Sequence, residues 1–168
     1  MIGTEPVIRI GPQEFILSRM TEHDLLEVVE IEEQSGLSCW GWDAYYNELD
    51  EASGALMFVA RLQSAGGAGA RERVGGFVAS RLAADELHIN NIAVRHAYRR
   101  SGIGGALLSA VLREGARRGA RKALLEVRLS NEAAQKLYAK YGFQAIGRRP
   151  NYYMQPPEDA LVMSARLG

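Results

Sequence analysis

The sequence predicts a single α/β domain built around a mixed β-sheet. The chain has 168 residues, which is enough for one domain with a substantial core. Short apolar runs typical of strands alternate with segments in which apolar residues recur at helical spacing. Glycine-, proline- and polar-rich turns separate these segments, and the chain shows no internal repeat.

The first part of the chain predicts one strand and two helices. Residues 1–13 hold glycines and prolines without periodicity, so we expect a loose leader. A strand is expected over Phe15–Arg19. Thr21 then opens a helix in the manner of a capping box, and Ser35-Gly36 ends it. A turn is expected over Cys39–Asp43, with a short helix after it.

The middle of the chain predicts three strands. The first covers Leu56–Leu62 and the second Val74–Leu82. Residues 63–73 between them are rich in glycine and alanine, which predicts a flexible hairpin loop. The third strand covers Leu87–Val94.

The remaining chain alternates helices and strands. The expected elements are a helix from the glycines at 102–105 to Arg118, a strand over Lys122–Arg128, a helix from its cap Asn131 to Gly142, and strands over Phe143–Arg148 and Ala160–Arg166.

Charge and cysteine content exclude several classes of protein. Twenty basic and twenty acidic residues balance, so overall charge favours neither a nucleic-acid partner nor a membrane. No apolar run reaches the roughly 18 residues of a membrane span, and no signal pattern opens the chain.

The single cysteine, Cys39, excludes an internal disulfide, which favours a reducing compartment, and we expect a cytoplasmic protein. No neighbour activates the Cys39 thiol, so we expect a small buried residue rather than a nucleophile. The three histidines, His23, His88 and His96, form no ligand pattern, so no metal is expected.

A basic glycine-containing turn between a strand and a helix predicts an anion site. This turn runs Arg99-Arg100-Ser101-Gly102-Ile103-Gly104, with Gly105 following. The first N–H groups of a helix lack internal acceptors and bind anions, glycine lets a phosphate approach the backbone, and arginine adds charge-assisted bonds. Leu107 occupies the third position of a dinucleotide fingerprint, and a Walker lysine is missing. The glycines alone leave a plain strand–helix turn with solvated arginines as an equal alternative.

Several segments together carry a resemblance to a known family. The run from His88 to Val94 and the turn from Tyr98 to Leu108 resemble the acetyl-CoA motif of the GNAT superfamily of N-acetyltransferases. Its pattern, Arg/Gln-x-x-Gly-x-Gly/Ala, is filled by Arg99, Gly102 and Gly104. Two later motifs of the family resemble Leu125–Ala134 and Leu137–Phe143, and the tail that holds Arg148–Tyr153 and Glu158–Ala160 is similar to RimI-like ribosomal-protein-alanine N-acetyltransferases. The resemblance is strong over residues 74–166 and thin before residue 40.

The resemblance implies a GNAT fold over the single domain 1–168, with acetyl-CoA as cosubstrate. It implies about seven mostly antiparallel strands and about four helices, with strand Leu87–Val94 splayed from its parallel neighbour Lys122–Arg128. Pantetheine would enter this gap and pair with unpaired strand edges. The oxyanion would meet backbone N–H groups near Ile92–Val94. The cofactor-binding residues implied are Ile92, Ala93, Val94, Arg99, Arg100, Ser101, Gly102, Ile103, Gly104, Gly105, Asn131 and Tyr138.

Two residues are candidates for proton transfer. Glu126 interrupts an apolar run, so desolvation is expected to raise its pKa, unless it stands at a strand end in solvent. Tyr138 lies at helical spacing with Leu137 and Tyr141, which by itself predicts a core tyrosine. The resemblance implies that Glu126 is the general base, acting through water, and that Tyr138 protonates the departing thiolate.

The resemblance also implies an acceptor, the N-terminal alanine of ribosomal protein S18. Asn151-Tyr152-Tyr153 and Glu158-Asp159 match that subgroup. Trp40 and Trp42 either line an acceptor groove or belong to the core. Acidic side chains that attract a basic peptide, or simply form a solvated face, are Asp43, Glu48, Asp50 and Glu51.

Two other functions stay open at this stage. One is a GNAT enzyme that acts on small amines or lysine side chains. The other is a non-catalytic acyl-CoA-binding sensor, against which the presence of both Glu126 and Tyr138 argues. We expect no direct contact with nucleic acid or membrane, and the sequence does not indicate an oligomeric state.

Overall fold

A computed structural model describes residues 6–63 and 74–168 of the chain. Its strands are β1 (Val7–Ile10), β2 (Gln13–Arg19), β3 (Ala55–Gln63), β4 (Val74–Ala83), β5 (Glu86–Val94), β6 (Lys122–Arg128), β7 (Gln144–Met154) and β8 (Pro157–Arg166). Its α-helices are α1 (Leu25–Gln34), α2 (Gly41–Glu48), α3 (Ile103–Arg117) and α4 (Glu132–Lys140). Short 3-10 turns cover Glu22–Asp24, Glu51–Ser53 and His96–Tyr98.

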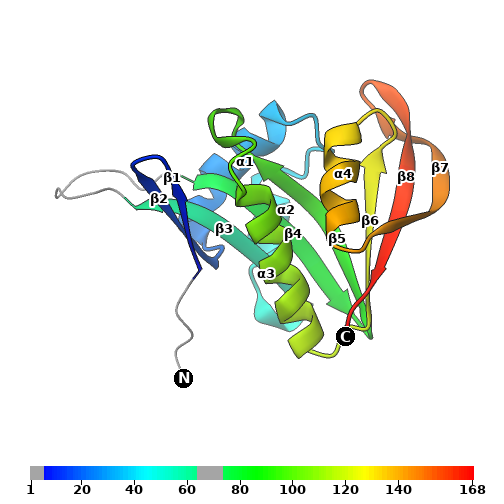
Figure 1. Cartoon of the computed structure of the whole chain (residues 1–168), viewed down its shortest axis with the longest axis horizontal. Helices are drawn as coiled ribbons and strands as arrows, with labels where there is room; N and C mark the ends of the chain where they lie inside the picture. The colour runs from blue at the N-terminus through cyan, green and yellow to red at the C-terminus, as the bar shows by residue number, and fades with distance from the viewer. Residues whose placement is uncertain (1–5, 64–73) are drawn as a thin grey trace.

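All the strands lie in one sheet, shown in Figure 1. The order of its eight strands is β1-β2-β3-β4-β5-β6-β8-β7. Only the β5–β6 pair is parallel within the described chain, and every other neighbouring pair is antiparallel. The mixed, mostly antiparallel sheet is therefore confirmed, with one strand more than the seven expected.

The extra strand lies in the segment expected to be a loose leader, so that prediction was wrong over residues 7–10. Val7 and Ile8 pair with Ile16 and Phe15 of β2. Ile8 and Ile10 pack against the main core, which explains why this short segment is ordered. Residues 1–5 lie outside the described residues, as do residues 64–73 of the expected hairpin loop.

The two C-terminal strands are longer than the sequence predicts. β7 continues to Met154, six residues beyond the expected end at Arg148, and β8 begins at Pro157 rather than Ala160. β7 is an edge strand whose residues are exposed except for Tyr153, so it lacks the apolar alternation that marks a strand in the sequence. Its pairing with β8, not its own periodicity, sets its length.

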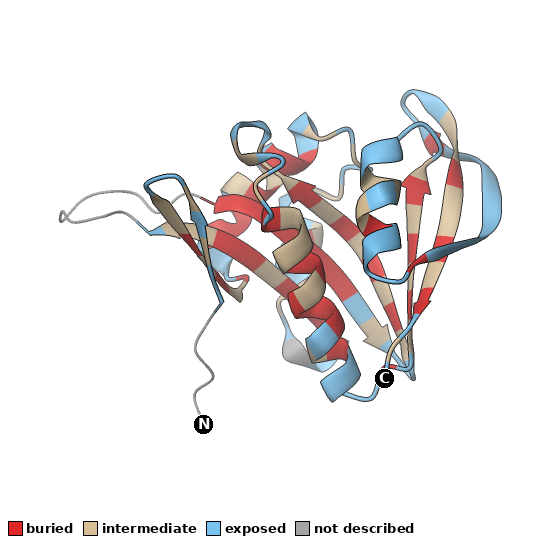
Figure 2. Ribbon diagram, viewed as in Figure 1, coloured by how far each residue is buried: buried red, intermediate tan, exposed pale blue. Residues whose placement is uncertain are grey.

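The helices cover both faces of the sheet (Figures 1 and 2). α3 and α4 pack on one face, over a core that includes Leu87, Leu107 and Leu125. α1 and α2 pack on the other, over a second core that includes Tyr45 and Phe77. Burial of a large apolar side chain contributes roughly 1.5–3 kcal/mol, so these two layers hold the sheet rigid from both sides.

One irregularity in β5 separates the central strands. Ala79 of β4 pairs with Asn91, but the next residue, Ser80, pairs with Ile89, so Asn90 is an extra residue in β5. An extra residue of this kind is a β-bulge, which bends its strand and increases the local twist. Pairing of β5 with β6 runs from Glu86–Lys122 to Ile89–Leu125 and ends there among the described residues. The expected splay is thus confirmed, and it begins at the bulge.

Within the described ranges, we find no helix with the length and apolar character needed to cross a membrane.

Candidate active site

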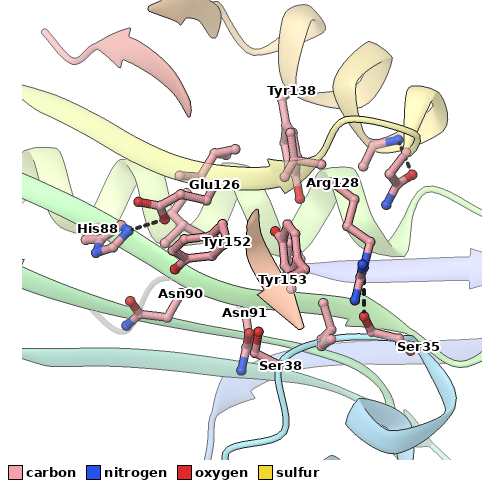
Figure 3. Close-up of a pocket in the computed structure, with 18 of the residues that line it drawn as sticks. Ser35, Ser38, His88, Asn90, Asn91, Glu126, Arg128, Tyr138, Tyr152 and Tyr153 are labelled. Carbon is pink, nitrogen blue, oxygen red and sulfur yellow. Dashed lines mark hydrogen bonds and ion pairs between the residues drawn. The ribbon is translucent and has the colours of Figure 1, made fainter. Parts of the chain in front are cut away.

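A pocket occupies the opening where β5 and β6 separate (Figure 3). Its walls come from both faces of the sheet. Residues 35–40, which join α1 to α2 and are called the α1–α2 segment below, line it on one side, and α4 lines it on the other. The residues that line it are Ser35, Gly36, Leu37, Ser38, Trp40, His88, Ile89, Asn90, Asn91, Ile92, Leu125, Glu126, Val127, Arg128, Asn131, Ala134, Tyr138, Tyr152 and Tyr153. The structure therefore brings Glu126, Tyr138, Asn131 and Ile92 of the predicted site together around one opening.

Glu126 lies on β6 within this pocket and has two cationic or potentially cationic neighbours. Its side chain is 9% exposed. His88 Nε2 of β5 lies 2.7 Å from Glu126 Oε2, and Arg149 Nη2 of β7 lies 3.5 Å from Oε1. Figure 3 shows the His88 ring and the Glu126 carboxylate directed toward each other. The splayed strands thus present a paired carboxylate and imidazole, not an isolated carboxylate.

The expected rise in the pKa of Glu126 is wrong. The hydrogen bond with His88 lowers the pKa of this carboxyl below its usual value, and the nearby charge of Arg149 acts in the same direction. Burial raises the pKa, as the apolar neighbours in the sequence predicted, but it is outweighed. Sequence reasoning missed both partners because they come from strands far away in the chain.

Tyr138 lies on α4, and its side chain reaches the pocket. It is 6% exposed and belongs to the core beneath α4, where its ring lies 5.9 Å from that of Phe143. Figure 3 shows it extending from α4 toward Tyr153. Burial raises the pKa of its hydroxyl, so the phenol is protonated at neutral pH. The tyrosine is therefore both a core residue and a pocket residue.

The basic turn after β5 leads directly into the first turn of α3. Gly102 precedes the helix with φ of +92°, a conformation that favours glycine. The first bond of the helix runs from Ala106 N to Gly102 O at 3.0 Å, so the N–H groups of Ile103, Gly104 and Gly105 precede the helical ladder. A Cβ atom at Gly105 would lie 2.7 Å from the Tyr141 hydroxyl. Glycine thus keeps this first turn open between α3 and α4.

The other residues of that turn have local contacts that shape it. Arg99 Nε donates to Val94 O at 3.1 Å and turns the chain back on the end of β5. The Ser101 hydroxyl donates to Tyr98 O. Arg100 adopts φ of +60° and is exposed. Arg99 and Arg100 thus come shortly before a helix start whose first N–H groups precede the helical ladder, which is the combination expected of an anion site.

Asn131 caps α4 as the sequence predicted. Its Oδ1 accepts from Ala134 N at 3.2 Å. The same residue lines the pocket, so capping and ligand contact are compatible.

A buried carboxylate that sequence reasoning missed fixes the α1–α2 segment. Glu32 is fully buried and accepts from Trp40 N at 2.7 Å, from Gly41 N at 3.2 Å and from the Tyr45 hydroxyl at 2.7 Å. Asn91 Nδ2 of β5 lies 3.3 Å from the same carboxylate and 2.8 Å from the Tyr45 oxygen. This network joins α1, α2 and β5 because a buried carboxylate requires several donors. Its only signal in the sequence is a glutamate at an apolar position of α1.

The α1–α2 segment and the helix after it differ from the prediction in two details, which are the exposure of Cys39 and the start of α2. Cys39 is exposed, not buried, because the segment crosses the surface beside the pocket. Trp40 lines the pocket and packs against the α1–α2 core, whereas Trp42 is exposed and stacks on Tyr46 at 4.8 Å. α2 begins at Gly41, before the expected start after Asp43. Of the acidic residues expected near an acceptor, Glu48 pairs with Arg81, and Asp43 and Asp50 are exposed.

The tyrosines of β7 reach the pocket because β7 bulges. Arg149 pairs with Ala160 and Tyr153 with Glu158, which places two extra residues on β7. Asn151, at φ of +52°, donates its N–H to Asp159 Oδ1 at 2.8 Å and holds this bulge. Burial raises the pKa of Tyr153 to about 12 and also raises the pKa of Tyr152.

These features agree with comparison to known proteins. The chain belongs to the acetyltransferase (GNAT) family, whose model matches residues 20–143. Its fold and its splayed, pocket-bearing strands are those of an N-acetyltransferase, and enzymes with this fold use acetyl-CoA as acetyl donor.

The most informative relatives have one substrate in their names. The [ribosomal protein bS18]-alanine N-acetyltransferase of Haemophilus influenzae is 31% identical over 155 residues, covering 90% of this chain and 99% of the relative. A Bacillus subtilis protein that carries the same name provisionally is 36% identical over 144 residues, covering 86% and 90%. The crystal structure of the ribosomal-protein-S18-alanine N-acetyltransferase from Escherichia coli superposes with a TM-score of 0.76 at 31% identity, covering 92% of this chain and 94% of that one.

The His88–Glu126 contact predicts a measurable shift in ionisation. In His88→Gln, the carboxyl loses the partner that lowers its pKa most while burial still raises it, so the pKa of Glu126 should rise. A titration of the glutamate side-chain carboxyl carbons by NMR would measure this. A group with a lowered pKa stabilises the fold above its unfolded-state pKa and loses that contribution as pH falls through the folded pKa. The variant should therefore show a smaller loss of stability on acidification.

His96→Gln is the matched control, since His96 lies in the turn after β5 and outside the pocket. An unchanged Glu126 titration in His88→Gln would show that the contact does not control this carboxyl.

Proposed function

We propose that the chain transfers the acetyl group of acetyl-CoA to the N-terminal α-amine of a protein, and that the protein is ribosomal protein S18 with an N-terminal alanine. The observation that carries the proposal is the convergence of Glu126, His88 and Tyr138 on a single opening in the sheet. The names of three relatives that cover most of the chain support the acceptor. The substrate is a ribosomal protein, so the proposal places the reaction in the cytoplasm.

The donor would enter from the face that carries α3 and α4. The N–H groups of Ile103, Gly104 and Gly105 would bind the pyrophosphate, with Arg99 and Arg100 beside them. The pantetheine amides would then pair with β5 at Ile92, Ala93 and Val94, where β6 no longer does. The site fits such a ligand because β5 has no pairing with β6 beyond Ile89 among the described residues, and the first N–H groups of α3 precede its helical ladder. Ser101, Gly102 and Asn131 would complete the contacts.

The acceptor would enter from the opposite face, past the α1–α2 segment. Its ammonium must lose a proton before its nitrogen can attack the thioester carbonyl. Glu126 is ionised at neutral pH and hydrogen-bonded to His88, so the pair can accept this proton, directly or through a water molecule. An imidazole is a stronger base than a carboxylate, so we propose the Glu126–His88 pair, rather than Glu126 alone, as the general base.

The carbon–sulfur bond then breaks and leaves a thiolate that needs a proton. Tyr138 is protonated and lies in the pocket, so its hydroxyl can supply this proton. Backbone N–H groups near Ile92–Val94 would stabilise the negative charge that develops on the carbonyl oxygen. The nitrogen gives up its second proton as the intermediate collapses to the amide, and this proton replaces, through solvent, the one that Tyr138 lost. The proton held by the Glu126–His88 pair goes to solvent, so each turnover releases one proton.

Acetylation of defined amines separates this proposal from its alternatives. The purified chain and acetyl-CoA would be incubated with an S18 N-terminal peptide, the same peptide with a blocked α-amine and one lysine, and a polyamine. We expect the free terminal amine to be acetylated at least about ten-fold faster, as measured by mass spectrometry. Faster reaction of lysine or polyamine would favour the small-amine or lysine enzyme. Cofactor binding without turnover on any amine would favour the sensor.

The proton-transfer roles predict losses in turnover rather than in cofactor binding. Glu126→Gln and Tyr138→Phe should each lower kcat by roughly 10²–10⁴-fold, the usual contribution of general acid–base catalysis. Calorimetry should give a Kd for acetyl-CoA within about two-fold of wild type. Glu86→Gln and Tyr46→Phe are matched controls, since both side chains are exposed and outside the pocket. Near-normal turnover in either site variant would remove the corresponding role.

A negative charge introduced at Gly104 tests the proposed anion site at the start of α3. Gly104→Asp should weaken acetyl-CoA binding at least about ten-fold, because a carboxylate would lie against the pyrophosphate. Gly104→Ala controls for the added Cβ, whose nearest neighbour would be Leu137 Cδ2 at 3.4 Å. Equal dissociation constants for the two variants would place the pyrophosphate elsewhere.

A further inference from the structure

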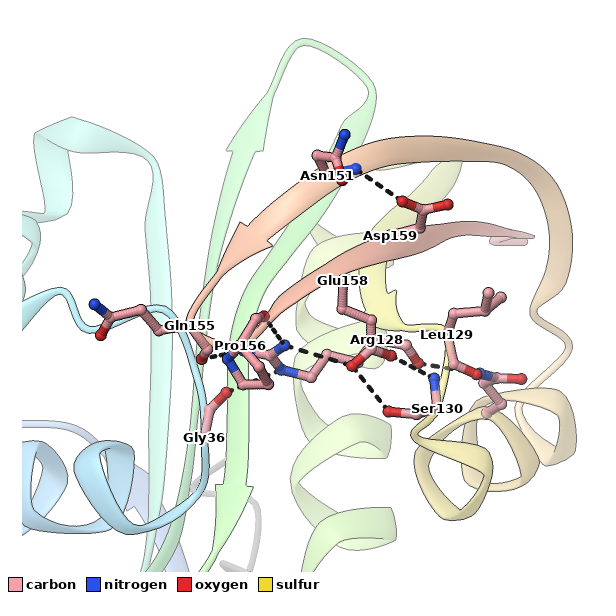
Figure 4. Close-up of polar contacts among 10 residues, drawn as sticks. Gly36, Arg128, Leu129, Ser130, Asn151, Gln155, Pro156, Glu158 and Asp159 are labelled. Carbon is pink, nitrogen blue, oxygen red and sulfur yellow. Dashed lines mark hydrogen bonds and ion pairs between the residues drawn. The ribbon is translucent and has the colours of Figure 1, made fainter.

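Arg128, the last residue of β6, joins two segments that lie far apart in the chain (Figure 4). Its Nε donates to Gly36 O at 3.3 Å, just after α1. Its Nη1 and Nη2 donate to Pro156 O at 3.1 Å and Gln155 O at 3.0 Å, in the turn between β7 and β8. One guanidinium therefore bonds to three backbone carbonyls from two segments.

These two segments belong to, or directly follow, two different parts of the pocket wall. The α1–α2 wall contributes Gly36, Leu37 and Ser38 to its lining, and β7 contributes Tyr152 and Tyr153 just before the turn that Arg128 binds. Over residues 6–63 and 74–168, we find no other hydrogen bond or ion pair between the α1–α2 wall and the β7–β8 turn. Arg128 is thus the polar link between these two parts of the wall among the described residues.

The guanidinium is held in place before any ligand binds. It lies 4.2 Å from the centre of the Tyr153 ring and 3.5 Å from Glu158 Oε1. Glu158 is itself fixed by Ser130, which donates from its N–H at 2.6 Å and from its hydroxyl at 3.0 Å. The side chain of Arg128 is only 17% exposed. Because its contacts are already formed, the bridge costs little further ordering when an acceptor enters.

A planar, five-donor side chain is required for this bridge. Arginine can donate in fixed directions to carbonyls on both sides at once, whereas the single ammonium of lysine cannot span the same set. The bridge holds the two segments together at the end of β6, two residues after Glu126. A terminal α-amine brings its own peptide backbone close to Glu126, where these segments can contact it. A lysine amine is carried there by four methylene groups, so its backbone stays further away.

We propose that Arg128 is a positioning residue that joins the α1–α2 wall to the β7–β8 turn and thereby restricts the acceptor to chain termini. This inference rests on the proposed function for its acceptor, but the bridge itself can be tested without turnover.

The test compares Arg128→Lys and Arg128→Met with wild type on the terminal-amine peptide and on the blocked lysine peptide. KM for the terminal-amine peptide should rise at least about five-fold, with kcat and the Kd for acetyl-CoA changed less than about two-fold. The ratio of kcat/KM between terminal and lysine acceptors should fall at least about ten-fold. Amide hydrogen exchange at residues 36–41 should accelerate in both variants, because the bond to Gly36 O is lost.

Arg148→Met is the matched control, since it removes an exposed ion pair with Asp159 on the same hairpin and leaves the bridge intact. If Arg128→Met fails to fold, Arg128→Lys keeps the charge and most of the volume, and it decides the question. An unchanged acceptor ratio with unchanged exchange in folded Arg128→Lys overturns the inference. Faster exchange with an unchanged ratio also overturns it, because the bridge would then be structural only. If wild type itself prefers lysine, the proposed function fails, and the exchange experiment still reports on the bridge.

Discussion

The opening between β5 and β6 depends on one extra residue. Asn90 has no partner of its own in β4, so β5 bends there and its pairing with β6 stops at Ile89 and Leu125. The backbone edges beyond that point are not satisfied by each other, and a ligand can pair with them. Without the bulge, the same register would continue the parallel pair to Ile92 and Arg128 and would close the gap in the middle of the sheet.

The same opening joins two faces of the sheet that are otherwise separate. On one face, the first turn of α3 and the hydroxyl of Tyr138 belong to the larger core. On the other, Glu126 meets His88 and Arg149 beneath the α1–α2 segment. A donor and an acceptor can therefore approach from opposite sides and meet only in the gap. Under the proposed function, this division would keep the N–H groups that bind the pyrophosphate away from the pair that accepts a proton.

Two buried polar side chains tie together the walls around the gap. Glu32 ties the α1–α2 segment to β5 through Asn91, and Arg128 ties the same segment to the β7–β8 turn. Both side chains are largely buried and bond to backbone groups, so removal of either leaves unpaired polar atoms.

The sequence by itself determined the α/β class, most of the strands and helices, and the glycine turn that begins α3. These features are local: periodicity, caps and glycines act over a few residues. It also placed Glu126 and Tyr138 on the correct elements. It failed for β1, the length of β7 and the exposure of Cys39, because pairing with the next strand and the packing of the surrounding chain, not the local pattern, decide these features. Only the tertiary structure decided that His88 and Arg149 would face Glu126 and lower its pKa, because the charge around a carboxyl depends on what packs against it. For the same reason, only the folded chain shows that Arg128 joins the two walls of the pocket.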